Sequence, residues 1–339
     1  MEKKRARKNH ILPKSFLRNF ASKDEKIFTL DFEQKKVFES HIDQAAIITD
    51  FYTVKTIDNE EDDCIEQGFL SKFEGFINVI DAIVETKQLP RDLEGRNKLI
   101  NYMALMYVRG PRFRQILFEI YDAFARKMNK DLTEDENQFN AFKESFQKDK
   151  GISFPFDFQQ ARDMASKVNI SVEIPRTYYI EQMMKKASDL VFPLGRMTQN
   201  LFYIPFSYDY FFITADMPII PVHNGNWLKD KNAWMVFPIS SKCCIVLDYD
   251  RSPKVCRIVS CKQIASINGW TACNCSRMAF SQKDKFIWRD ERGGISDDMR
   301  KLIDFLGPEK KNQPLTQPPF QGIETKCFND WNLLKSDDQ

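Results

Sequence analysis

The 339-residue chain is poor in several residue types on which common enzyme motifs depend. It holds only three histidines, too few for a His-rich zinc site. Its 12 glycines form no Gly-rich phosphate loop. Fifty basic residues face 48 acidic ones, so the net charge of +2 indicates no partner and any electrostatic signal must be local. Because no window holds about 18 consecutive apolar residues, we expect no membrane-spanning helix.

The eight cysteines form no recognisable ligand or redox motif. None has the C-x2-C spacing of a zinc knuckle, and Cys273-x-Cys275 is too tight for one. The basic N-terminus lacks the apolar segment of a secretion signal. We therefore expect reduced thiols in a cytoplasmic protein. Hydrophobic residues make up 42% of the chain, with 29 phenylalanines, which predicts a large, aromatic-rich core.

The secondary-structure signals segregate along the chain, which favours an α+β fold over alternating α/β. We expect an N-terminal β-hairpin cap, a central helical block, and a C-terminal mixed or antiparallel sheet with flanking helices. These parts would form one domain over residues 1–307, followed by a mostly irregular, proline-containing tail at 308–339. The expected ranges are 9–53 for the cap, 60–192 for the helical block and 200–290 for the β-rich part.

Local patterns predict several element boundaries. Pro13 opens a short helix with Phe16, Leu17 and Phe20 on its apolar face. The chain then alternates as a hairpin over Lys26–Asp31 and Lys36–Ser40. Gly110-Pro111 should break or kink a helical stretch that runs from 91 to 128. Finer predictions are a capping box at Thr133-x-x-Glu136, a strand over 210–214 and a helix over 261–280.

Asp216 is the first candidate site residue. It follows the aromatic and β-branched run Tyr210–Thr214, and Pro218 prevents further ladder donation just beyond it. A carboxylate at the end of a buried strand is held rigidly and can face a cleft. The same position is equally typical of an ordinary turn aspartate.

Further polar candidates lie in the first third of the chain. His10 stands just before the short helix, and Glu66 and Glu74 lie eight positions apart, about 80° round a helix. Both glutamates also suit a solvated flank. Two basic groups could contact phosphates, or simply be exposed. The first is the N-terminal cluster, and the second surrounds the predicted kink: Lys3, Lys4, Arg5, Arg7 and Lys8, and then Arg109, Arg112 and Arg114.

Three stretches together resemble the bacterial DUF4238 family. His10-x-x-Pro13-x-x-Phe16-Leu17-x-x-Phe20 is similar to its opening signature, and Ile65-Glu66…Phe73-Glu74 to its paired "IE" helix. Ile213–Pro218 followed by Phe237–Ser240 resembles its "TSDNP…PLS" segment, with Ala215 for serine and Met217 for asparagine. The resemblance covers roughly residues 9–280. It implies a shared fold and points to His10, Glu66, Glu74, Arg109, Asp216 and Pro218, but supplies no reaction.

The polar set suggests one enzymatic hypothesis, a metal-dependent phosphodiesterase or nuclease-like effector of bacterial defence or toxicity. His10 would be the general base or acid, and Glu66, Glu74 and Asp216 acids. Mg2+ or Mn2+ would bind to Glu74 and Asp216, because these hard cations prefer oxygen ligands. Arg109 would clamp phosphate, and the basic groups would bind nucleic acid. No established nuclease motif accompanies the set.

The alternative hypothesis is a non-catalytic binding or interaction protein with a protein partner. In it the same residues form a buried hydrogen-bond network that joins the N-terminal cap to the C-terminal sheet. A histidine beside a turn and an acid at a strand end can satisfy each other without any substrate. The spatial arrangement of His10, Glu66 or Glu74, Arg109 and Asp216 should discriminate between the two hypotheses. Convergence on a solvent-open pocket favours catalysis, whereas dispersal or a sealed, dry network favours binding or structure.

Overall fold

The protein is described from a computed structural model. The structure describes residues 8–49, 51–52, 54–55, 61–62, 75–167, 172–222, 233–249, 256–290 and 293–307. The fold is α+β, with strands near both ends of the chain and helices between them. The chain divides into two compact units. We call Met1–Arg112 with Ile180–Gln339 the main unit, and Phe113–Tyr179 the helical unit. The predicted single domain over 1–307 stays a prediction.

The larger sheet of the main unit has five strands in the order β12-β7-β11-β10-β9. Neighbouring strands are antiparallel except β12 and β7, which are parallel, so the sheet is mixed as predicted. Its central strands are rich in β-branched and aromatic residues, which suit a pleated and buried surface. The strands are β7 (Thr198–Tyr203), β9 (Ile220–Val222), β10 (Trp234–Ser240), β11 (Cys243–Asp248) and β12 (Cys256–Ile258).

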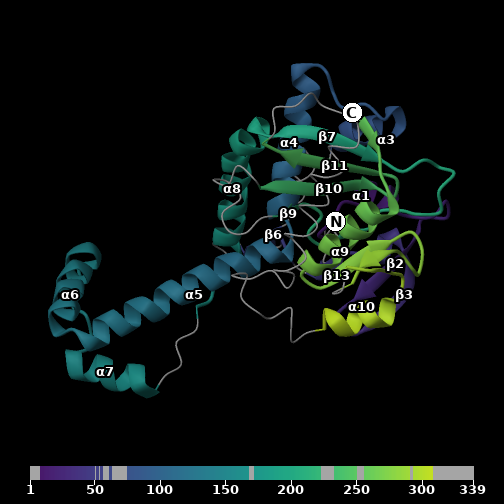
Figure 1. Ribbon diagram of the computed structural model, residues 1–339. Helices are drawn as coiled ribbons and strands as arrows, with labels where there is room; N and C mark the ends of the chain where they lie inside the picture. Colours follow the sequence, from purple (N-terminus) through teal and green to yellow (C-terminus); the bar gives the residue numbers. More distant parts are fainter. Residues whose placement is uncertain are drawn as a thin grey trace, which may run out of the picture. The chain divides into compact units, whose positions relative to one another are not determined.

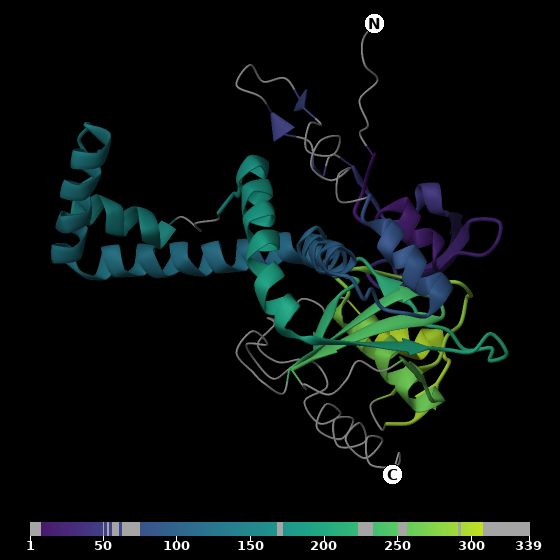
Figure 2. The same cartoon turned by 90° about the horizontal axis from the view of Figure 1, so that it is seen from above.

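Helices cover both faces of this sheet (Figure 2). On one face, Trp234 and Val236 of β10 pack with Trp270 of α9 (Cys261–Asn274). On the other, Phe237 stacks on Phe16 of α1 (Lys14–Arg18) with ring centroids 5.8 Å apart, and approaches Tyr102 of α4 (Leu93–Val108). The period-two alternation of side chains along β10 therefore supplies both layers of the core.

The smaller sheet joins the two ends of the chain. Its order is β3-β2-β13-β8, and antiparallel pairing of β2 with β13 brings Leu30 opposite Ala279. The N-terminal hairpin therefore packs against the C-terminal β region. Its strands and the helix beneath them are β2 (Lys26–Asp31), β3 (Lys36–His41), β8 (Thr214–Ala215), β13 (Met278–Ser281) and α10 (Met299–Phe305).

Short elements complete the N-terminal part. The predicted helix start is confirmed, because Pro13 is the N-cap of α1, and the predicted apolar face is buried with Phe16, Leu17 and Phe20 all at 0% exposure. The hairpin prediction is confirmed by β2 and β3. The remaining short elements are β1 (Lys8–His10), β4 (Ile47–Thr49), β5 (Val54–Lys55), β6 (Glu61–Asp62), β14 (Trp288–Arg289), β15 (Ile295–Ser296) and the 3-10 turn Ile42–Gln44.

The long helical stretch breaks where Gly110-Pro111 predicted. α4 ends at Val108, and α5 (Pro111–Glu134) begins at the proline, whose missing N–H costs nothing in a first turn. Two further helices are α3 (Ile77–Thr86) and α8 (Arg176–Arg196). Ile77, Ile80 and Ile83 are spaced three residues apart and form the buried face of α3.

In the helical unit, α6 (Glu136–Lys150) and α7 (Phe158–Lys167) lie beside the C-terminal half of α5 (Figure 1). Six phenylalanines pack there, with steep ring angles in every cited pair except Phe142–Phe146, at 38°: Phe139, Phe142, Phe146, Phe154, Phe156 and Phe158. The predicted capping box is wrong. Thr133 lies in the last turn of α5 and donates to the Asn129 carbonyl, whereas Asp135 caps α6, because a helix already in progress occupies the threonine.

Two other predictions were wrong for a common reason. Residues 210–213 are not a strand, and the predicted helix over 261–280 ends at Asn274. The buried Asn268 side chain accepts from Ile213 N at 3.1 Å and donates to the carbonyls of Phe211 and Ile287. A side chain thus takes the backbone groups that a ladder would use. After α9, the amides of residues 276–278 turn toward Asp216 and the chain continues as β13.

Candidate functional site

Asp216 lies at the end of β8, beside the loop that joins α9 to β13. Its carboxylate accepts three backbone hydrogen bonds, from Ser276 N at 2.7 Å, Arg277 N at 2.7 Å and Met278 N at 2.9 Å. Its own N–H donates to the Met278 carbonyl at 3.0 Å. The residue is 1% exposed. Hydrogen bonds from several amides stabilise a buried carboxylate in its charged form, so this aspartate organises the chain reversal that precedes β13.

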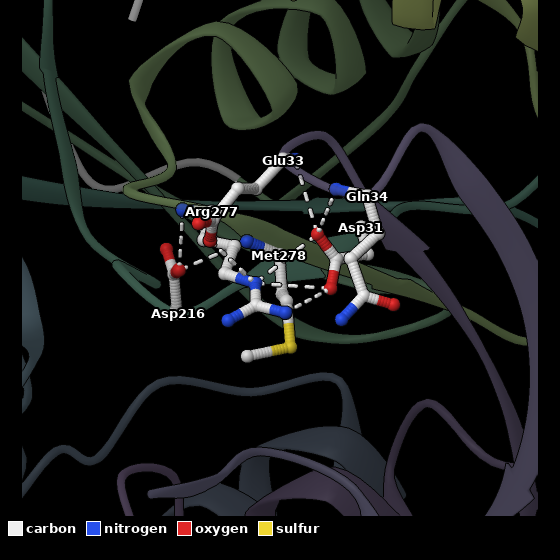
Figure 3. A network of polar contacts seen from close by, with 6 residues as sticks. All are labelled: Asp31, Glu33, Gln34, Asp216, Arg277 and Met278. Atoms are coloured by element: carbon white, nitrogen blue, oxygen red, sulfur yellow. Dashed lines mark hydrogen bonds and ion pairs between the residues drawn. The ribbon is translucent and has the colours of Figure 1, made fainter. Parts of the chain in front are cut away.

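Arg277 extends the network to the N-terminal hairpin (Figure 3). Its Nη2 lies 2.6 Å from Asp31 Oδ2, and its Nε lies 2.9 Å from the same oxygen and 3.1 Å from Oδ1. Nε also lies 3.1 Å from the exposed Glu33 carboxylate. The Phe32 N–H donates to the Arg277 carbonyl at 3.0 Å. One arginine therefore ties β13 to the β2–β3 turn through both its side chain and its main chain.

The pKa values in this network favour the ionised pair. Burial alone would raise the pKa of Asp31, but hydrogen bonds from Arg277 and from the Gln34 and Glu33 amides outweigh it, and the pKa is lowered. The hydrogen bond to Asp31 raises the pKa of Arg277. Side-chain exposure is 3% for Asp31 and 38% for Arg277, so solvent screens the arginine more than its partner.

His10 and Arg109 meet at a second, neighbouring point. Arg109, which is 1% exposed, donates from Nη2 to the His10 carbonyl at 3.0 Å. Tyr52 donates its hydroxyl to the Arg109 carbonyl at 2.6 Å. His10 Nδ1 lies 3.2 Å from the Ala45 carbonyl, which can only accept, so Nδ1 carries the hydrogen and Nε2 the lone pair. Burial lowers the pKa of His10, and the charges of Lys14 and Arg109 act in the same direction, so the ring is neutral near pH 7.

Gly110 connects this point to Asp216. A Cβ added to Gly110 would lie 2.5 Å from the backbone oxygen of Asp216, closer than any real contact allows. The turn after α4 therefore packs directly on the main chain of Asp216, which requires a residue without a side chain. Three of the predicted site residues, His10, Arg109 and Asp216, thus belong to one neighbourhood.

Several other candidates cannot be placed in it. Glu66 and Glu74 lie outside the described residues, as do Lys3, Lys4, Arg5 and Arg7. Lys8 begins β1. Arg112 lies in the first turn of α5, and Arg114 holds its guanidinium 5.8 Å from the centre of the Tyr179 ring. Pro218 follows Asp216 within the buried stretch 211–220.

The chemistry of Asp216 can be compared with the predicted Mg2+ or Mn2+. Amide N–H groups point their positive ends at both of its oxygens, an environment that already supplies what a cation would. Among the residues with a described placement, no group of three or more histidine, cysteine, aspartate or glutamate side chains could hold a metal ion. Because the second predicted ligand, Glu74, is outside these residues, the metal prediction stays a prediction.

Sequence reasoning missed the partners of Asp216. The Asp31–Arg277 pair joins residues 246 positions apart, and no local spacing reveals such a contact. One signal was present, because aspartate at the first position of the turn after β2 is typical of side-chain capping: Asp31 Oδ1 accepts from the amides of Glu33 and Gln34. Asn268 is the other missed centre, with three hydrogen bonds at 0% exposure.

Comparison with known proteins identified one protein family that matches the chain. The family model described as "Protein of unknown function (DUF4238)" matches residues 8–285, a range that includes the whole Asp31–Asp216–Arg277 network. No curated protein and no solved structure matches the chain. Of the helices that the structure describes, none combines the length and the apolar character needed to cross a bilayer.

Proposed function

The chain belongs to the DUF4238 family, and we propose that it is a non-catalytic binding protein in which Asp216 is a structural joint. One observation carries this proposal: the Asp216 carboxylate accepts three backbone N–H groups within 2.9 Å. A catalytic base or metal ligand needs a lone pair directed at a substrate or ion. Here three hydrogen bonds to the carboxylate serve the turn between α9 and β13.

The surroundings of this joint support the same proposal. Asp31 and Arg277 neutralise each other, and both contact the turn that Asp216 organises. Gly110 packs against the Asp216 carbonyl, so the Arg109–Gly110 turn is fixed to the same point. The polar residues therefore connect α4, the N-terminal hairpin and β13. A buried hydrogen-bonded network of this kind favours one packing arrangement of these elements.

The substitution Asp216→Asn tests the proposal, because an amide keeps the shape but places an NH2 group against N–H donors. We expect a loss of about 3 kcal/mol in the free energy of unfolding, since charge-assisted hydrogen bonds are lost in a buried site. Urea unfolding measures it. Asp24→Asn is the matched control, because Asp24 is exposed and should lose less than about 0.5 kcal/mol. An Asp216→Asn protein as stable as the parent would contradict the structural role.

A metal-dependent phosphodiesterase or nuclease-like effector of bacterial defence or toxicity is the second candidate function, and it competes with the binding proposal. The observation favouring it is the neutral His10 ring, with its Nε2 lone pair, in a residue whose carbonyl accepts from the Arg109 guanidinium. A cleavage assay tests this function. Labelled single- and double-stranded DNA and RNA are incubated with the protein and Mn2+ or Mg2+, and the products are separated on denaturing gels. We expect no cleavage beyond that of a folded His10→Gln variant. Cleavage by the parent that is lost in His10→Gln would establish the enzyme and overturn the binding proposal.

A further inference from the structure

The loop between β7 and β8 displays two aromatic side chains to solvent. Phe206 is 82% exposed, the highest exposed fraction among the large hydrophobic side chains of the described residues, and Tyr208 is 50% exposed. Both lie on one turn, in which Tyr208 N donates to the Pro205 carbonyl at 3.0 Å. We call Phe206 and Tyr208 the aromatic platform. A partner that covers these two rings would remove apolar surface from water, so they can serve as anchors for binding.

The loop that carries the aromatic platform is held in place. Lys242, which follows β10, extends its Nζ to the carbonyls of Tyr208 and Tyr210, both at 2.7 Å. Asp209, between them, forms an ion pair with Lys283. The ends of the loop continue into buried residues, Ile204 and Phe211. Because these contacts fix the backbone before any partner arrives, binding at the platform costs less conformational entropy.

The charges around the platform are mainly positive. Lys87 Nζ lies 5.5 Å from the centre of the Phe206 ring, and Lys242 and Lys283 flank Tyr208 and Asp209. These contacts bring three ammonium groups and one carboxylate, which is paired with Lys283, to the loop with the two exposed rings. An apolar pocket on a protein partner would accommodate the rings but would not need the ammonium groups. Stacked bases joined by phosphates match both features.

We propose that the aromatic platform stacks the bases of a single-stranded nucleic acid while Lys87, Lys242 and Lys283 attract its phosphates. The inference rests on the proposed binding function and names its partner class. Base stacking on an aromatic ring tolerates any base sequence, so the site would prefer single strands over duplexes without reading sequence. Salt should weaken the complex, because phosphate contacts release counterions.

Fluorescence anisotropy with a labelled oligothymidylate of about 12 nucleotides tests the proposal. We expect the parent protein to bind this strand, and Phe206→Ala to weaken binding by about tenfold. Phe206→Trp, which retains an aromatic face, should restore it. The matched control is Phe192→Ala, because Phe192 is also a 72% exposed phenylalanine beneath a cation, with Arg196 5.8 Å above its ring. This control should bind as the parent does.

An abasic strand of the same length and charge separates stacking from simple charge attraction. If bases stack on Phe206, the parent should bind the abasic strand more weakly, and Phe206→Ala should not weaken that binding further. Lys87→Gln should make the slope of log affinity against log salt shallower by about 0.7, the value for one phosphate contact in a single strand. Thermal unfolding of each variant confirms that its fold is intact.

Three results would overturn the platform: no binding of the oligothymidylate by the parent, equal affinities of folded Phe206→Ala and parent, or equal losses in Phe206→Ala and Phe192→Ala. The proposed function fails separately. If the bound strand is recovered cut in the presence of Mg2+ and intact in EDTA, the protein is an enzyme, although the platform still binds. If the strand is recovered intact and Phe206→Ala weakens binding, both proposals stand.

Discussion

Arg277 and Asp31 form an ion pair that joins the last strand of the smaller sheet to the N-terminal hairpin, with Nη2 and Oδ2 2.6 Å apart. The main chain of Arg277 adds two further contacts, one to Asp216 and one to Phe32. The N-terminal hairpin, β13 and Asp216 are therefore joined through a single residue. Since the smaller sheet pairs N-terminal strand β2 with β13, this ion pair stabilises the contact between the two strands.

Replacement of Arg277 should show how much the pair stabilises the fold. Arg277→Met leaves the Asp31 carboxylate buried with its backbone donors alone. We expect the free energy of unfolding to fall by about 2 kcal/mol, a value that allows for solvent screening of the partly exposed arginine. Arg277→Lys keeps the charge without the fork geometry and should lose about half as much. Urea unfolding measures both variants. Equal stability of Arg277→Met and the parent would show that the pair contributes nothing.

The lowered pKa of Asp31 predicts a dependence on acid. Because the folded-state pKa lies below the unfolded value of about 3.9, the unfolded state binds more protons in this range, and stability rises with pH. The contribution should be complete above about pH 5 and disappear as pH falls through the folded pKa. Unfolding free energies of the parent and Asp31→Asn should therefore converge on acidification. A difference that stays constant with pH would contradict the linkage.

Gly110→Ala should destabilise the protein, because the new Cβ would lie 2.5 Å from the Asp216 backbone oxygen. Backbone atoms yield poorly, so we expect a loss of about 1–3 kcal/mol. Gly195→Ala is the matched control. Gly195 lies inside α8, and a Cβ added there would meet only Ile100 Cδ1, at 3.6 Å. This variant should therefore gain up to about 0.5–1 kcal/mol in the free energy of unfolding through helix propensity. If both variants shift the melting temperature in the same direction, the close approach is not limiting.

Asn268→Leu should also be costly, because Asn268 serves three backbone groups at 0% exposure. Leaving these groups unpaired should reduce the free energy of unfolding by about 3 kcal/mol. Asn274→Ala provides the comparison, since Asn274 makes one bond within α9, to the Trp270 carbonyl, and should lose under about 1 kcal/mol. Similar losses at the two positions would show that Asn268 does not organise residues 211–213.

Thiol chemistry tests the cysteine prediction. Cys243, Cys244, Cys261, Cys273 and Cys275 are free thiols in the structure, and burial raises the pKa of Cys244. Titration of the denatured, unreduced protein should find all eight cysteines of the sequence. In the native protein, Cys243, Cys244 and Cys275 should react slowly because they are buried. A denatured count well below eight would show disulfides and contradict the reduced state.

By itself, the sequence determined the local elements. The short helix after Pro13, the hairpin of β2 and β3, the break at Gly110-Pro111 and the apolar face of α3 all follow from spacings of a few residues. It also marked His10, Arg109 and Asp216, which the structure brings into one neighbourhood. These signals are readable because helix and strand periodicities and proline geometry act on adjacent positions.

Only the tertiary structure decided what the marked residues contact. An aspartate after a strand can bind a metal, a histidine or amides, and Asp216 accepts from amides because the loop after α9 arrives beside it. The Asp31–Arg277 pair and the pairing of β2 with β13 join distant segments. Residues 210–213 do not form the predicted strand, because the Asn268 side chain hydrogen-bonds the Ile213 N–H and the Phe211 carbonyl. Such choices depend on which groups meet in space, and local sequence spacing carries no information about that.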